Sequence, residues 1–193
     1  AANIPLGPFS FVEAVVMGPE NIVEPTIDKT TLAARLYTTV GSLKIEGGVA
    51  AKPFAYKDGN GFETSPYIAM QGNIGPDWYL ASSVHIPLQE NPMDRMKNTW
   101  VVSGGLFQLL TVGWSGTLTL RLEALLSPFK PWRSAEEDDS YALMLYPEIV
   151  YAPDDSHSFS LRSIFSPIDF SALVALGANW NAFQGFHVNM ALL

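Results

Sequence analysis

SGTLTLRLEALLSPF, residues 115–129, alternates between apolar and polar side chains. Every even position from 118 to 126 is leucine or alanine, whereas the odd positions include Thr119, Arg121 and Glu123. Because successive side chains of a β-strand point to opposite faces, this period of two predicts a strand with one apolar and one charged face. The fold depends on whether the apolar face contacts a protein core or lipid.

The same alternation recurs along the whole chain and indicates strands rather than helices. No segment has a convincing helical amphipathic pattern. We expect eleven strands, at about residues 8–17, 31–40, 43–54, 65–74, 77–89, 98–111, 115–127, 141–152, 157–165, 170–180 and 183–193. The predicted fold class is therefore all-β, with antiparallel strands.

One predicted hairpin fixes a register that can be checked. Gly41-Ser42 is a two-residue loop with glycine first, as a type II′ turn requires. The turn pairs Val40 with Leu43, and the apolar partners beyond them meet on one face. On the other face Glu46 lies diagonal to Arg35, which predicts a cross-strand charge pair.

The composition lacks the charge that coats most water-facing proteins. Charged residues make up 16% of the 193-residue chain, against about 25% in typical soluble domains. The formal net charge of −8 argues against a nucleic-acid groove. The absence of cysteine excludes disulfides and thiolate metal sites.

Two long uncharged stretches, 99–120 and 171–193, could be taken for membrane helices. The first contains four glycines and the second several asparagines, a glutamine and a histidine. A helix would place these polar groups in hydrocarbon, whereas alternation places them on one side of a strand. We therefore expect strands in both stretches.

Four features favour a membrane barrel over a soluble β-sandwich. The predicted strands have about 10–12 residues, against about 5–6 in soluble sheets, and a tilted strand needs about 9–11 to cross a bilayer. The polar face is rich in glycine, alanine, serine and tyrosine, and aromatic residues such as Tyr141 and Tyr151 lie near strand ends. Short connections alternate with longer ones, such as 55–64, 90–97 and 128–140.

These segments together resemble a bacterial outer-membrane β-barrel of the porin-like kind. The resemblance is carried especially by DWYLASSVHIPL (77–88) and FSALVALGANWNAFQGFHVNMALL (170–193). It implies one transmembrane barrel domain or barrel segment over 1–193, with about 10–12 strands, in contact with the lipid of the outer membrane. Because the last predicted strand ends on the outer side, either the strand count is wrong by one or further strands or subunits complete the barrel.

If the apolar side chains face lipid, the opposite side chains line a lumen. The predicted pore-lining residues are Arg35, Lys44, Glu46, His85, Arg121, Glu123, Glu148, Arg162 and His187. Cations and anions are mixed among them, which predicts a transverse field and weak selectivity. The alternative is that they form salt bridges along the inner wall.

No catalytic or metal site is predicted, and no cofactor is expected. His85 lies two residues from Ser83 on one face, about 7 Å apart, and no carboxylate companion is evident in sequence. Asp-Gly-Asn-Gly at 58–61 resembles the start of a calcium loop without its later ligands, so a turn is expected there.

We expect passive passage of small hydrophilic solutes through the lumen. The first alternative is a non-transporting outer-membrane surface protein whose long loops bind partners. The second is a soluble β-sandwich or lipocalin-like carrier.

Overall fold

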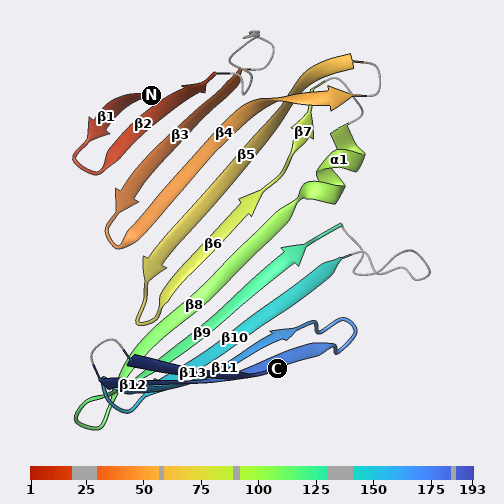
Figure 1. The fold of residues 1–193 in the computed structure, drawn as a ribbon. Helices are drawn as coiled ribbons and strands as arrows, with labels where there is room; N and C mark the ends of the chain where they lie inside the picture. The colour runs from red at the N-terminus through yellow and green to blue at the C-terminus, as the bar shows by residue number, and fades with distance from the viewer. Residues whose placement is uncertain (19–29, 57–58, 89–91, 130–140, 184–185) are drawn as a thin grey trace.

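In a computed structural model of the chain, one antiparallel sheet contains nearly all the regular structure (Figure 1). The structure describes residues 1–18, 30–56, 59–88, 92–129, 141–183 and 186–193. The strands are β1 (Ala2–Gly7), β2 (Ser10–Met17), β3 (Thr31–Val40), β4 (Leu43–Tyr56), β5 (Gly59–Asn73), β6 (Asp77–Ser83), β7 (Ile86–Pro87), β8 (Val101–Val112), β9 (Gly116–Ser127), β10 (Ala142–Ala152), β11 (His157–Phe165), β12 (Ala172–Phe183) and β13 (Phe186–Leu192). The predicted all-β antiparallel class is confirmed.

The sheet is open. Its strands are ordered as in the sequence from β1 to β13, except that the short β7 pairs with β5 beside the main path. Within the described chain β1 pairs only with β2, and β13 pairs only with β12, so both are edge strands. The closed barrel expected from the sequence is therefore not formed by these residues. Twelve strands lie on the main path, so β1 and β13 run in opposite directions.

The strand count of eleven was wrong because the chain has two short strands, β1 and β7, that alternation does not reveal. β1 was missed because Pro5 and Pro8 interrupt its pattern, and an edge strand tolerates proline. The predicted strand over 77–89 stops at Ser83, and the chain then forms β7 and the helix α1 (Pro92–Thr99). Proline in the first helical position suits a helix start, but this eight-residue helix is too short to show an apolar stripe.

The predicted hairpin is confirmed in register. Val40 pairs with Leu43 across the turn, and Gly41 has a φ of 61°, as the first central position of a type II′ turn requires. Arg35 Nη1 lies 3.5 Å from Glu46 Oε1, so the expected diagonal pair forms.

Short turns and longer connections lie at opposite ends of the strands (Figure 1). The short-turn end holds 41–42, 74–76, 113–115 and 153–156, whereas β6, β9 and β11 each end at the other end of the sheet, where the described residues 84–88, 92–100 and 166–171 lie. One expected long connection is wrong, because β4 and β5 extend to leave only 57–58 between them. The turn expected at 181–182 is also wrong, because β12 continues to residue 183. The turn expected from Asp-Gly-Asn-Gly begins outside the described residues, and β5 already includes positions 59–61.

The sheet is a single layer, and the described residues form no core under it. Among them Pro87 is the only apolar side chain that is buried. The accessible surface is 13386 Å², whereas a folded monomer of 21.1 kDa exposes about 9,000 Å². No helix in the described part of the chain is long and apolar enough to cross a membrane.

Candidate functional site

One face of the sheet is an exposed apolar band, which we call the apolar face. Directly paired residues of neighbouring strands lie on the same face, so the register places the even positions of β3 and β9 together with the odd positions of β10. Its exposed members include Leu32, Leu36, Ile68, Leu106, Leu122, Ile149, Leu161, Leu176 and Met190. Leu122 is 43% exposed, and no second layer covers it in the described structure.

The opposite face, which we call the polar face, carries most of the residues predicted to line a pore. The register places Arg35, Lys44, Glu46, Arg121, Glu123, Glu148 and Arg162 on it. His85 follows β6 and reaches toward β5 on the same side. The backbone of His187 pairs with Asn181, and its side chain is outside the described structure.

The charged side chains of the polar face form a ladder of ion pairs across the strands. In its first half Arg35 Nε lies 2.6 Å from Glu13 Oε2, and Arg35 also pairs with Glu46 on the next strand. Tyr67 on β5 donates its hydroxyl to Glu46 at 2.5 Å. Four consecutive strands, β2 to β5, are thereby linked through Arg35 and Glu46.

The second half repeats this pattern on β6 to β11. Tyr79 donates to Glu123 at 2.9 Å, and Arg121 Nη2 lies 2.6 Å from the same carboxylate. Arg121 Nη1 also lies 3.9 Å from Glu148 Oε2. The other oxygen of Glu148 lies 2.6 Å from Arg162 Nε. These arginines are about half exposed or more, so each pair is screened by solvent and salt.

Both ladder tyrosines lie across a glycine of the neighbouring strand. Tyr67 is paired with Gly48, and Tyr79 with Gly105. A Cβ atom added to Gly105 would collide with the ring of Tyr79, and one added to Gly48 would lie 2.7 Å from the ring of Tyr67. Glycine at these two positions lets the rings lie flat, so that their hydroxyls reach the ladder carboxylates.

A hollow of about 670 Å³ lies toward the short-turn end of the sheet. Lys44, Gln71, Tyr79, Arg121 and Glu123 are among its lining residues. Among the described residues no carboxylate lies within ion-pair distance of Lys44. The hollow therefore offers both hydrogen-bond donors and acceptors.

The polar face has apolar patches that the alternation did not predict. Phe107 and Leu109 on β8 share a face with Arg121 and Thr119, and they are 40% and 56% exposed. Leu173 on β12 faces the same side and is also exposed. Strict alternation of apolar and polar side chains therefore fails on these strands.

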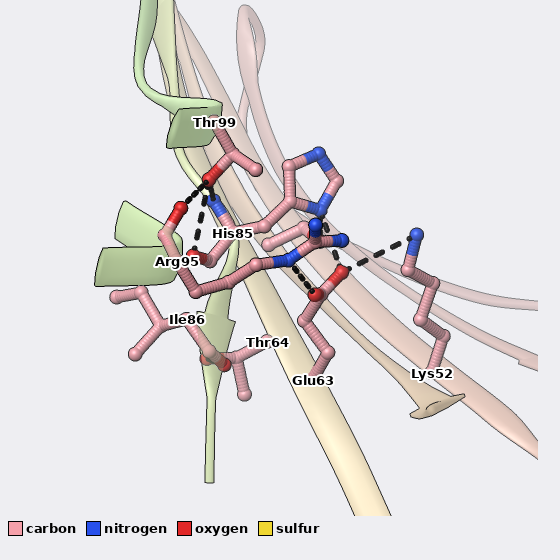
Figure 2. Close-up of polar contacts among 8 residues, drawn as sticks. Lys52, Glu63, Thr64, His85, Ile86, Arg95 and Thr99 are labelled. Atoms are coloured by element: carbon pink, nitrogen blue, oxygen red, sulfur yellow. Dashed lines mark hydrogen bonds and ion pairs between the residues drawn. The ribbon is translucent and has the colours of Figure 1, made fainter. Parts of the chain in front are cut away.

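At the end with the longer connections, a second set of charges surrounds Glu63, and we call Lys52, Glu63, His85 and Arg95 the Glu63 cluster (Figure 2). Glu63 is 0% exposed. Its Oε2 accepts from Arg95 Nε at 2.9 Å. Its Oε1 lies 2.8 Å from His85 Nδ1 and 3.5 Å from Lys52 Nζ. Both carboxylate oxygens are thus occupied, as a buried charge requires.

Backbone contacts hold this cluster together. β7 pairs with β5 through Glu63↔Pro87 and Thr64↔Ile86, which brings the connection back against the sheet. Thr99, at the end of α1, donates to the carbonyl of Arg95 at 2.7 Å and accepts from the N–H of His85 at 3.0 Å (Figure 2). Arg95 is therefore held on the polar side of the sheet although it lies outside every strand.

The Glu63 cluster resembles a hydrolase relay only in composition. Ser65 Oγ lies 2.9 Å from His85 Nδ1, the same nitrogen that contacts Glu63. A nucleophile relay needs the serine on one ring nitrogen and the carboxylate on the other. Because Glu63 is held by two further cations, this geometry suits an anchored ion cluster better than acyl transfer.

No group of three or more His, Asp or Glu side chains within the described ranges could hold a metal ion.

The turn between β10 and β11 contains a hydrogen-bonded aspartate. Asp154 accepts from the N–H of Ser156 at 2.7 Å and from the N–H of His157 at 2.9 Å. The hydrogen bond from the His157 ring, together with those backbone bonds, lowers the pKa of Asp154 below its ordinary value.

Sequence reasoning missed Glu13, Glu63, Tyr67, Tyr79 and Arg95 as members of these networks. Alternation could have found Glu13 and both tyrosines, because they occupy polar-face positions of strands. Glu63 and Arg95 lay in segments assigned to connections, and no local pattern pairs them.

No protein-family model, curated protein or solved structure matches this chain. Its class is therefore defined by the fold and the two faces alone: a long-stranded, single-layer antiparallel sheet with one apolar and one charged face.

Proposed function

We propose that this sheet is the wall of a transmembrane β-barrel in a bacterial outer membrane, and that its polar face borders a lumen for small hydrophilic solutes. One observation carries the proposal: a continuous apolar face is exposed across the sheet, and Pro87 is the only apolar side chain that is buried among the described residues. An apolar face of this extent requires an apolar environment.

Strand length and chain direction agree with this proposal. β8, β9 and β12 each have 12 residues, and a tilted strand needs about 9–11 to cross the hydrocarbon. The sheet is a simple up-and-down meander with short turns at one end, which is the arrangement of membrane barrels.

Closure is a further requirement of the proposal. Unpaired strand edges are not tolerated in hydrocarbon, so β1 and β13 need strand partners there. Such partners are each other, further strands of the same polypeptide or strands of other chains. On closure the charged ladder would face the enclosed water, and its mixed signs would give weak ion selectivity.

Site-directed spin labelling tests which solvent touches each face. The chain has no cysteine, so Thr119→Cys, Leu120→Cys, Leu122→Cys and Glu123→Cys each give a single labelling site. In vesicles we expect labels at 120 and 122 to be relaxed by oxygen, and those at 119 and 123 by a water-soluble nickel complex. Protection of 120 and 122 from both reagents would place protein against the apolar face and refute the membrane proposal.

Planar-bilayer recording then tests passage. Stepwise conductance that disappears without the protein supports a lumen open to solutes. Spin-label alternation without conductance would instead indicate an outer-membrane surface protein that binds partners through its longer connections.

A further inference from the structure

The Glu63 cluster differs from the ladder in its balance of charge. In the ladder Arg35 lies between two carboxylates, and Arg121 does too. In the Glu63 cluster one carboxylate contacts Lys52, Arg95 and His85. Among the described residues the cluster therefore has a surplus of at least one positive charge, within a chain whose net charge is −8.

Glu63 cannot neutralise its cations further, but it holds them in place. Its side chain is fully buried and both oxygens are in use. The cationic side chains remain open to solvent, with exposed fractions of 44% for Lys52 and 40% for Arg95. Lys52 offers further N–H donors beyond its single ion pair, and Arg95 contacts Glu63 through Nε, which leaves its Nη groups for another acceptor.

The guanidinium of Arg95 is also oriented. Its Cζ lies 4.9 Å from the centroid of the Phe54 ring, on the same strand and face as Lys52. A fixed planar fork beside an ammonium matches the oxygens of a carboxylate or phosphate group.

We propose that Lys52 and Arg95, held by Glu63, bind an oxyanion, namely the carboxylate or phosphate group of a small solute. The proposal that an oxyanion binds here rests only on the geometry and charge of the Glu63 cluster. The conclusion that the ligand is a passing solute rests on the proposed function. The site would then select for anionic solutes at the end of the sheet with the longer connections.

Isothermal titration calorimetry with inorganic phosphate at low ionic strength tests the binding on the full chain in detergent. Lys52→Met removes one donor at the periphery of the cluster, and about tenfold weaker binding is expected from the loss of one charge-assisted hydrogen bond. Lys44→Met is the matched control, because Lys44 lies on the same strand and face and contacts no carboxylate in the described structure. Its affinity for phosphate should equal that of the wild type.

Absence of phosphate binding by the wild-type chain overturns the proposal. Equal weakening by Lys52→Met and Lys44→Met also overturns it, because the attraction would then be general to the positive charge of the polar face. The same titration in zwitterionic vesicles, with and without phosphatidylglycerol, distinguishes a solute from a lipid headgroup as the source of the oxyanion. If phosphate binding is weakened only in the vesicles that contain phosphatidylglycerol, the lipid headgroup competes with phosphate for the site and is the source of the oxyanion.

Phosphate binding and solute passage through a lumen can be refuted independently of each other. Phosphate binding without bilayer conductance would retain the oxyanion site and reject the lumen. Conductance without phosphate binding would retain the lumen and reject the site.

Discussion

The Glu63 cluster and the ion-pair ladder both contain arginine–glutamate pairs on the same face, but they differ in burial. Ladder carboxylates such as Glu123 are partly exposed, at 28%, whereas Glu63 is fully buried. Water competes for each ladder pair, so the net stabilisation of a pair is small. A buried carboxylate has no water to replace a lost partner, so its partners are strongly required. Burial rather than distance therefore decides which ion pairs stabilise this sheet.

Removing the arginine of the Glu63 cluster should have the largest effect. Arg95→Met leaves Glu63 with only His85 and Lys52, and we expect the free energy of unfolding to fall by about 3 kcal/mol, as for a broken buried pair. Arg162→Met is the matched control, since Arg162 also bonds a glutamate through Nε, at 2.6 Å, but is 66% exposed. Urea unfolding followed by tryptophan fluorescence measures both. Equal losses in the two variants would remove the distinction between cluster and ladder.

Replacing a glycine that lies beneath a ladder tyrosine should have the second-largest effect on the free energy of unfolding. In Gly105→Ala the new methyl group displaces the Tyr79 ring and breaks its bond to Glu123, at an expected cost of about 2 kcal/mol from overpacking. Gly104→Ala is the control, because a Cβ at Gly104 meets only ordinary contacts at 3.4 Å or more. If both variants unfold at the same urea concentration, the ring does not depend on that glycine.

A single ladder arginine should matter less. Arg121→Met removes the cation between Glu123 and Glu148, and the expected loss is about 0.5 kcal/mol at low salt, which is typical of exposed pairs. Raising the ionic strength should shrink this loss, whereas the loss in Arg95→Met should persist, because buried pairs are screened much less. A loss in Arg121→Met that is unchanged by salt would show that the ladder behaves as a buried network.

The sequence predicted the strands of this sheet well because their period of two reports the two faces directly. For the same reason Arg35, Glu46, Arg121 and Glu148 were assigned to one face, and the register confirms that shared face. The Glu63 cluster could not be predicted, since it joins β5 to a helix across 32 residues. Non-local contacts of this kind depend on how the connection folds back, which alternation does not encode. Closure is not encoded either, because the period of two gives the faces of each strand and not which strands pair at the edges of the sheet.

The smallest effect should come from Asp154, whose carboxylate is exposed like those of the ladder but bonded locally within one turn. Its lowered pKa means that the folded state holds the charged form more tightly than the unfolded chain does. This stabilisation is present above the ordinary aspartate pKa of about 3.9 and is lost as the pH falls through the lower value of the folded state. Asp154→Asn keeps an acceptor for the N–H groups of Ser156 and His157 but removes the charge. Wild type and variant should therefore unfold at the same urea concentration near pH 2, and the wild type should be slightly more stable at pH 5. A stability difference between the two that stays constant from pH 2 to pH 5 would mean that the turn depends on geometry alone, and that charge contributes to stability only in the ladder and the Glu63 cluster.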